Sequence, residues 1–382
     1  MKPTVLFLLL IFLLTGCGQT QPGADTAPPV PPATEAAPEQ TLPPATEAAD
    51  PLEVLLGIMP TEYKVGQLFL ARCPEENQVE DIKAYHLGGY ILFGRDFAGQ
   101  TAASLTETLS QYQLAASIPL LIAVDEEGGT VTRASSNPAL RKSPFPSPRS
   151  LYAGGGMDAV LEAEEEKAEL LKSLGIHVNL APVCDITTDP GAFLYLRSLG
   201  QSPEITGRFA AEVTELYRSR QLGSVLKHFP GYGNNADTHT GIAVDNRTLE
   251  QLEAQDLIPF QMGIDAGSSA IMLSHNIVTA LDSTYPASLS PAVHHYLRET
   301  MGFAGVIVTD DLSMGAISQT YGAGEAAVLA VLAGNDLLCS TEYAVQYEAV
   351  LAAVEEGRIP GAVLDAAVLR ILRWKQSLGL MY

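Results

Sequence analysis

The segment KHFPGYGNNADTHT (227–240) concentrates residues that could perform acid–base chemistry. Lys227 and His228 are adjacent, and one residue separates Asp237 from His239. A nearby carboxylate can hold one imidazole nitrogen and make the other nitrogen more basic. The Asp237–His239 pair therefore predicts a general acid/base unit. The alternative is a polar loop in which both side chains only cap turns.

A metal centre is a second alternative for the same segment. His228, Asp237 and His239 supply ligand types that zinc accepts. The segment lacks a spaced helical motif such as HExxH, and none of the four cysteines belongs to a CxxC pair. We therefore expect no metal. Because GxGxxG after a strand and GxxxxGK[ST] are absent from the sequence, we expect no nucleotide cofactor either.

A candidate nucleophile is Asp310, which directly follows the apolar run GVIVT. A carboxylate at the point where a strand leaves the core is suited to attack a sugar and form a covalent glycosyl intermediate. Its neighbour Asp311 could instead cap the following helix, and capping is the alternative for Asp310 as well.

Three further charged residues suit the binding of sugar hydroxyls or of a carboxylate. Asp125 and Arg133 flank a Gly-Gly turn in DEEGGTVTR, and Arg197 stands in LYLRSLG. Each arginine taken singly could equally form a surface ion pair.

These candidates recur where short apolar runs end, which indicates the elements that must position them. Eight such runs alternate with longer segments of helical spacing, for example 158–174, 203–220 and 246–265. Continuous apolarity, rather than alternation, is typical of parallel strands buried on both faces. The eight runs are 65–71, 88–94, 120–125, 177–185, 224–230, 270–275, 305–310 and 334–340.

Eight strand–helix units over residues 51–382 predict an α/β fold, namely a (β/α)8 TIM barrel that forms a single catalytic domain. An open doubly wound sheet is the alternative, because the repeat alone does not fix closure. Active sites of barrels lie at the carboxyl ends of the strands. The ionisable residues at the ends of the runs are Asp125, Asp185, Lys227, His228, His275 and Asp310.

The composition limits the possible partners. Of 382 residues, 47% are hydrophobic and 17% are charged, which suffices for a large core. The formal net charge is −22, so the surface repels nucleic-acid phosphates and anionic lipid headgroups. We therefore expect no nucleic-acid partner, and any membrane attachment requires a covalent or inserted anchor.

The N-terminus predicts such an anchor. Residues 1–16 have the layout of a secretory signal, with an apolar run too short to span a bilayer comfortably. LTGC (14–17) resembles a bacterial lipobox, so Cys17 is the predicted lipidation site; an ordinary signal peptide with a chance cysteine is the alternative. Residues 17–50, in which PPATEAA occurs twice, predict a disordered tether. The expected location is extracytoplasmic, on the cell membrane.

Taken together, the motifs resemble those of glycoside hydrolase family 3, specifically its single-domain β-N-acetylglucosaminidases. KHFPGYGNNADTHT is similar to the family segment KHFPGHGxxxxDSH, and GVIVTDDLSM is similar to GVIxSDDLSM. DEEGGTVTR and APVCD agree with DxEGGxVxR and APVxD. The similar segments span about residues 60–345 and follow the family order.

This resemblance implies a retaining exo-β-N-acetylglucosaminidase (β-N-acetylhexosaminidase) that acts without a cofactor. The implied substrates are peptidoglycan fragments or chitin oligosaccharides, and a monomer is expected. By resemblance, Asp310 is the nucleophile, His239 the acid/base and Asp237 its orienting partner. The residues implied to bind the sugar are Asp125, Arg133, Arg197, Lys227 and His228.

Two positions depart from the family pattern. Tyr232 replaces a usual histidine, and Thr238 replaces a usual serine but retains the hydroxyl. Tyr232 puts substrate preference in question more than activity. The alternative functions are a β-glucosidase, a β-xylosidase or a glycoside phosphorylase of the same family, and a sugar-binding lipoprotein without catalysis.

Overall fold

The computed structural model describes residues 50–235, 237–239 and 241–381. The predicted signal peptide, the lipidation site Cys17 and nearly all of the predicted tether lie outside the described residues. The first described helix, α1 (Pro51–Ile58), begins where the carboxylate of Asp50 accepts a hydrogen bond from the backbone N–H of Leu52 at 3.0 Å. Within the described ranges, no helix has both the length and the apolarity needed to cross a bilayer.

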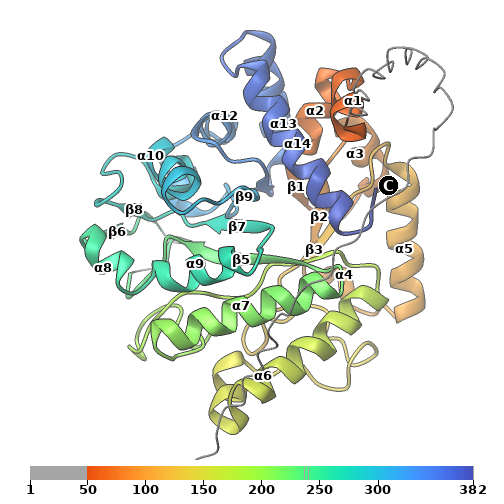
Figure 1. Cartoon of the computed structure of the whole chain (residues 1–382). Helices are drawn as coiled ribbons and strands as arrows, with labels where there is room; N and C mark the ends of the chain where they lie inside the picture. Colours follow the sequence, from red (N-terminus) through yellow and green to blue (C-terminus); the bar gives the residue numbers. More distant parts are fainter. Residues whose placement is uncertain (1–49, 236, 240, 382) are drawn as a thin grey trace, which may run out of the picture. The chain divides into compact units, whose positions relative to one another are not determined.

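Eight parallel strands form the central sheet in the order β10-β1-β2-β3-β4-β5-β7-β9 (Figure 1). Val308 of β9 and Leu337 beside β10 form a further parallel bridge, which joins the two end strands. The sheet therefore closes into the predicted barrel, and the open doubly wound alternative is wrong. The strands are β1 (Phe69–Arg72), β2 (Gly89–Leu92), β3 (Leu121–Val124), β4 (Val178–Asn179), β5 (Gly223–Phe229), β7 (Ala270–Leu273), β9 (Val306–Thr309) and β10 (Leu338–Ser340).

Every predicted run contains or overlaps one of these strands, but the first run was placed too early. Residues 65–67 end helix α2 (Thr61–Gln67), and β1 starts only at Phe69. Val65 and Leu68 are both buried. Because they are three positions apart, one helical turn can bury them together as readily as a strand can.

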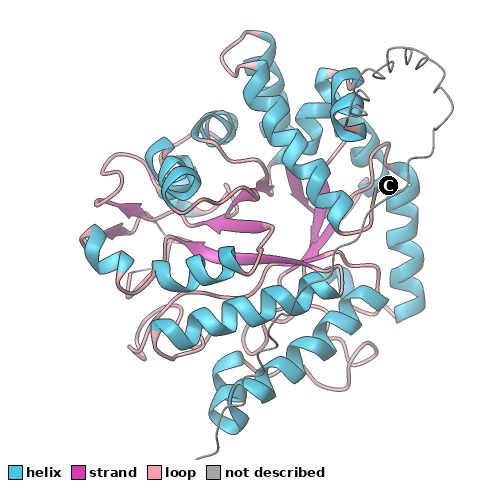
Figure 2. Ribbon diagram, in the orientation of Figure 1, coloured by secondary structure: helices cyan, strands magenta, loops and turns pink. Residues whose placement is uncertain are grey.

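Helices surround the barrel (Figure 2). The predicted helical segments 158–174 and 203–220 correspond to α6 and α7, whereas 246–265 is divided between α8 and α9. The remaining elements are α3 (Gln78–Tyr85), α4 (Gly94–Phe97), α5 (Ala102–Ala115), α6 (Pro148–Ser173), α7 (Pro203–Ser219), β6 (Val244–Asp245), α8 (Leu249–Glu253), α9 (Leu257–Asp265), β8 (Ile277–Val278), η1 (Ala287–Leu289), α10 (Pro291–His295), η2 (Tyr296–Thr300), α11 (Gly315–Ser318), α12 (Ala323–Ala333), α13 (Tyr343–Glu355) and α14 (Gly361–Ser377).

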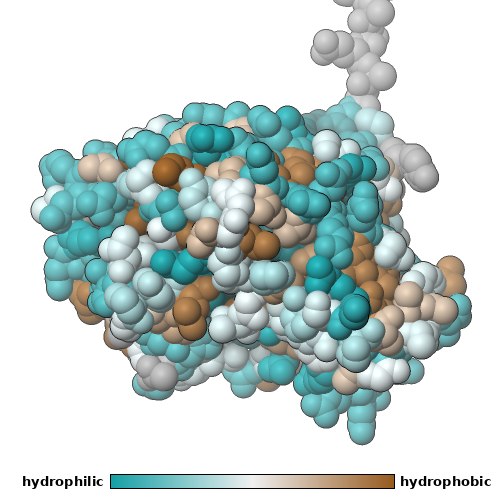
Figure 3. Space-filling view, turned by 90° about the horizontal axis from the view of Figure 1, so that it is seen from below, coloured by the Kyte–Doolittle hydropathy of each residue, from teal (hydrophilic) through white to brown (hydrophobic). Residues whose placement is uncertain are grey.

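The core lies between the strands and these helices. All seven residues of β5 are buried, and α7 presents Phe209, Val213 and Tyr217 from one face, four residues apart. Phe229 of β5 packs edge-on against Phe260 of α9, with the ring centroids 5.2 Å apart. The outer face shown in Figure 3 is mainly hydrophilic, and its hydrophobic residues lie in small separate groups. Polar side chains instead converge at the carboxyl ends of the strands.

Candidate active site

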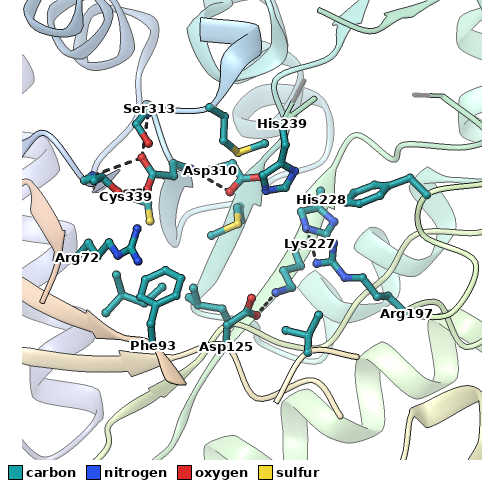
Figure 4. Close-up of a pocket in the computed structure, with 18 of the residues that line it drawn as sticks. Arg72, Phe93, Asp125, Arg197, Lys227, His228, His239, Asp310, Ser313 and Cys339 are labelled. Carbon is teal, nitrogen blue, oxygen red and sulfur yellow. Dashed lines mark hydrogen bonds and ion pairs between the residues drawn. The ribbon is translucent and has the colours of Figure 1, made fainter. Parts of the chain in front are cut away.

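A cavity of about 640 Å³ opens at the carboxyl ends of the barrel strands (Figure 4). Its wall includes seven of the eight site residues predicted from the sequence, and the eighth, Asp237, is hydrogen-bonded to one of the seven. The seven are Asp125, Arg133, Arg197, Lys227, His228, His239 and Asp310. Residues from the ends of four strands, β3, β4, β5 and β9, and from the loops that follow them are thereby brought together.

Asp310 follows β9, where its backbone N–H donates to the carbonyl of Leu273 at 3.0 Å. One carboxylate oxygen accepts the backbone N–H of Asp311 at 2.9 Å. Burial acts to raise the pKa of Asp310, but the imidazoles of His275 and His228 and this N–H bond outweigh it and hold the pKa below its ordinary value. Asp310 therefore lines the cavity as a carboxylate, the form that can act as a nucleophile.

Asp311 is used differently. Its carboxylate accepts the backbone N–H of Ser313 at 2.9 Å and the hydroxyl of Thr341 at 2.5 Å. Its carbonyl receives Nε2 of His275 at 2.9 Å. The side chain of Asp311 thus fastens the loop after β9 to the loop after β10. Neither aspartate caps the following helix, α11, whose N-cap residue is Met314, so the capping alternative is wrong for both.

Asp237 and His239 form the predicted pair. Oδ1 of Asp237 lies 2.6 Å from Nδ1 of His239 and accepts the backbone N–H of His239 at 2.9 Å. The imidazole is 57% exposed, on the wall of the cavity. Because Nδ1 faces the carboxylate, Nε2 is the nitrogen available for proton transfer.

The loop that carries this pair rests on the loop that carries Asp310. The carbonyl of His239 accepts the N–H of Gly315 at 3.3 Å, and the carbonyl of Thr238 accepts the N–H of Ala316 at 3.1 Å. The two loops that hold the candidate nucleophile and acid/base therefore support each other through main-chain hydrogen bonds.

Tyr232, the departure from the family pattern, braces this same loop. Its ring is buried in the cavity wall, and its hydroxyl contacts the hydroxyl of Thr238. The ring also packs edge-on against His228 at 5.4 Å. Burial raises the pKa of Tyr232 well above its usual range, so the hydroxyl remains neutral. Both unusual side chains therefore meet behind the acid/base loop.

Lys227 is the centre of a buried charge network. Its ammonium contacts the carboxylates of Asp125 and Glu127, the latter at 2.6 Å. Glu127 also receives Nε and Nη2 of Arg197 at 2.9 and 2.7 Å. Burial alone would raise the pKa of Glu127, but Lys227 and Arg197 hold it far below its ordinary value. Glu127, which sequence reasoning missed although it lies in DEEGGTVTR, thus fixes two predicted sugar-binding residues.

His228 is oriented by Asp185, which the sequence marked only as a strand-end carboxylate. Oδ2 of Asp185 lies 2.7 Å from Nδ1 of His228 and accepts the backbone N–H of the same residue at 2.9 Å. Its other oxygen accepts the N–H of Tyr232 at 2.8 Å. Nε2 of His228 lies 3.3 Å from Arg197. The carboxylate therefore fixes the imidazole ring and leaves Nε2 directed to the guanidinium.

Sequence reasoning also missed Arg72, the last residue of β1, and Phe93, which follows β2; both line the cavity. The available signal was a charged residue at the end of an apolar run, as for Asp125. In the described part of the chain, no three His, Cys, Asp or Glu side chains are grouped so as to hold a metal ion. The histidines of the suggested metal site instead face the carboxylates of Asp185 and Asp237 through Nδ1.

Comparison with known proteins gives a consistent result. Residues 60–374 match the Glycosyl hydrolase family 3 N terminal domain. The chain is 30% identical to Beta-hexosaminidase LpqI of Mycobacterium tuberculosis, over 95% of this chain and 94% of that protein. It is 34% identical to a Beta-hexosaminidase of Stenotrophomonas maltophilia, over 77% of this chain and 86% of that protein.

Solved structures include a similar barrel. A glycoside hydrolase family 3 beta-N-acetylglucosaminidase from Paenibacillus sp. superposes with a TM-score of 0.78 at 35% sequence identity. The similarity covers 84% of this chain and 63% of that one.

Proposed function

The chain belongs to glycosyl hydrolase family 3, and from this premise we propose that it is a retaining exo-β-N-acetylglucosaminidase that releases terminal N-acetylglucosamine. Relatives named beta-hexosaminidase and a related beta-N-acetylglucosaminidase structure support this activity. The observation that carries the proposal is that the loop of His239 and the loop after Asp310 are hydrogen-bonded to each other. His239, paired with Asp237, and Asp310 consequently face one cavity.

In the first step, a carboxylate oxygen of Asp310 attacks the anomeric carbon as the glycosidic bond breaks. His239, protonated on Nε2, gives this proton to the leaving oxygen. Asp237 stabilises the imidazolium through Nδ1. The products of this step are a covalent glycosyl-Asp310 ester and the released alcohol.

In the second step, neutral His239 takes a proton from water through Nε2, and the water oxygen attacks the anomeric carbon. The bond to Asp310 breaks, so the carboxylate and the imidazolium are regenerated. Two inversions give net retention of configuration. An imidazole thus takes the role that a second carboxylate has in most retaining glycosidases.

The charge network provides the binding wall for the sugar. Lys227, Arg197 and His228 supply donors, and Asp125 supplies acceptors. Glu127 fixes Lys227 and Arg197, Asp185 fixes His228, and Lys227 in turn holds Asp125. Fixed donors lose little entropy when they bind hydroxyl groups, which favours an ordered substrate pose.

The test is hydrolysis of para-nitrophenyl N-acetyl-β-glucosaminide by the purified full-length chain, compared with the corresponding glucoside and xyloside, with and without phosphate. Preference for the acetamido sugar, with water as acceptor, is the expected result. Activity on the glucoside or xyloside alone would overturn the substrate, and release of a sugar phosphate would overturn hydrolysis. Binding of N-acetylglucosamine without turnover of any substrate would indicate a non-catalytic sugar-binding protein.

We further propose that the chain is a lipoprotein anchored through Cys17 at the outer side of a membrane. The support is the sequence LTGC after an apolar run, followed by the Pro- and Ala-rich tether. Such a tether would give the barrel access to peptidoglycan fragments or chitin oligosaccharides outside the cytoplasm. Replacement of Cys17 with serine should move the protein from the membrane fraction to the soluble fraction.

A further inference from the structure

Thr238, which stands between the two members of the acid/base pair, is held at two points. Its carbonyl accepts the backbone N–H of Ala316 at 3.1 Å, which ties it to the loop after β9. Its hydroxyl contacts the hydroxyl of Tyr232. The side chain of Thr238 is fully buried, so water cannot replace this partner if it is removed. The position of Thr238 therefore depends on a side-chain contact as well as on a main-chain contact.

Tyr232 is itself fixed by contacts with the carboxyl ends of β4 and β5. Its backbone N–H donates to Oδ1 of Asp185 at 2.8 Å, and the same carboxylate holds His228 at the end of β5. Its ring is 1% exposed and packs edge-on against the imidazole of His228 at 5.4 Å. A buried ring on a hydrogen-bonded backbone has little freedom to move. Tyr232 therefore presents its hydroxyl to Thr238 from a fixed position.

The direction of the His239 imidazole depends on the backbone next to Thr238. The N–H and Nδ1 of His239 both lie within 2.9 Å of one oxygen of Asp237, so the ring is set relative to this stretch of chain. The imidazole is 57% exposed, and its ring contact is with Phe193, at 5.8 Å. Phe193 in turn lies 6.0 Å from the ring of Tyr232. A displacement of Thr238 would therefore carry the imidazole with it.

We propose that Tyr232, acting through the hydroxyl of Thr238, is a positioning residue that keeps His239 aligned with the leaving oxygen. The inference rests on the proposed function, in which Nε2 of His239 protonates that oxygen. Proton transfer requires the donor and the acceptor at hydrogen-bond distance, so a small displacement of the imidazole lowers the rate. The hydroxyl of Tyr232 is already engaged and its ring is buried. Tyr232 therefore governs leaving-group protonation rather than the choice of sugar.

The test measures kcat/KM, which reports cleavage of the glycosidic bond, for the phenyl and dinitrophenyl N-acetyl-β-glucosaminides. Phenolate needs a proton as it leaves, whereas dinitrophenolate departs without one. In full-length Tyr232→Phe the ratio of the phenyl value to the dinitrophenyl value should fall by about 3–10-fold, the effect of one hydrogen bond. Thr238→Val should lower this ratio to a similar extent. Thr238→Ser, which keeps a hydroxyl, should recover most of the ratio lost in Thr238→Val.

A double variant and a matched control separate positioning from a general loss of structure. Because one contact joins the two hydroxyls, the double variant of Tyr232→Phe and Thr238→Val should show a ratio no lower than either single variant. Tyr90→Phe is the control. Tyr90 is also fully buried and donates its hydroxyl to the carbonyl of Gln78 at 2.8 Å, but it does not line the cavity. The ratio in Tyr90→Phe should equal that of the wild type.

Three kinetic results overturn the proposal: an unchanged ratio in Tyr232→Phe, equal losses for both substrates, and losses in the single variants that multiply in the double variant. If the wild type cleaves no aryl glycoside, the proposed function fails instead. Histidine NMR then decides the positioning separately. The ring signals of His239, assigned with His239→Gln, should shift or broaden in Tyr232→Phe and not in Tyr90→Phe. Signals unchanged by Tyr232→Phe would overturn the proposal without reference to activity.

Discussion

Of the three fully buried lysines in the described part of the chain, Lys227 and Lys375 lie at opposite ends of the barrel, and their surroundings differ. Lys227, at the carboxyl end of β5, contacts two carboxylates, which raise its pKa against the opposing effect of burial. Among the described residues, Lys375 on α14 reaches only the amide oxygen of Gln67, at 2.5 Å and next to the amino end of β1. Burial lowers the pKa of Lys375 to about 7.

The difference shows what a buried cation does at each end. At the carboxyl end, the charge of Lys227 is matched by the carboxylates of Asp125 and Glu127, so these side chains remain ionised and fixed for binding. At the amino end, a single amide cannot stabilise a full charge, so the lysine loses its proton readily and reduces stability when it keeps it. Activity should therefore depend on the carboxyl end, and the pH dependence of stability should depend in part on the amino end.

The strongest test of this division is Asp310→Asn. Turnover should fall on the order of 10⁴-fold or more, because no carboxylate remains to form the glycosyl ester. The thermal midpoint should change little, since the side chain accepts only one backbone hydrogen bond. The companion variant Asp311→Asn should instead lose stability, because Asp311 fastens Ser313 and Thr341. Wild-type turnover in Asp310→Asn would refute the nucleophile assignment.

Removal of the acid/base imidazole should have the next largest effect. His239→Ala should lower kcat for alkyl and sugar leaving groups by about 10²–10⁴-fold. The loss should shrink for dinitrophenyl leaving groups, which depart without protonation. Asp237→Asn should cost less than His239→Ala, since the imidazole remains but loses its orienting carboxylate. A loss that is independent of the leaving group would contradict the assignment of His239.

Glu127→Gln should affect both activity and stability. The substitution leaves Lys227 and Arg197 buried with one carboxylate fewer, so the free energy of unfolding should fall by about 3–5 kcal/mol. Activity should fall as the sugar-binding wall loses its fixed geometry. Urea denaturation measures the first effect. The control Glu166→Gln breaks a surface pair with Arg141 and should cost about 1 kcal/mol or less.

Lys375→Met should change stability without changing turnover. In the folded protein Lys375 is protonated below about pH 7, whereas in the unfolded chain it is protonated up to its ordinary value of 10.5. The unfolded chain therefore binds more protons between these values, and stability rises with pH through that window. Methionine removes the penalty, so the free energy of unfolding at pH 7 should increase by about 1–3 kcal/mol.

Urea denaturation between pH 6 and pH 10 should give a flatter profile for Lys375→Met than for the wild type. Lys64→Met, which breaks the partly exposed ion pair with Asp365, should not flatten it. A variant with a wild-type pH profile would show that Lys375 is not the group responsible.

The sequence was sufficient to predict the barrel because buried parallel strands require continuous apolar runs. The sequence could not define where each strand begins, since a buried apolar residue such as Val65 fits a helix or a strand equally well. The catalytic residues were predictable because they stand in long motifs. The supporting residues were not: Glu127 and Asp185 act on partners 70 and 43 positions away, a pairing that only the closed barrel creates.

The main-chain bonds between the loop of His239 and the loop after Asp310 have a mechanical consequence. Because the loop of His239 is hydrogen-bonded to the loop that follows Asp310, a thermal displacement of one loop moves the other in the same direction. The distance between His239 and Asp310 then changes less than the position of either residue does. The barrel can therefore fluctuate at its mouth while the spacing between proton donor and attacking oxygen is conserved.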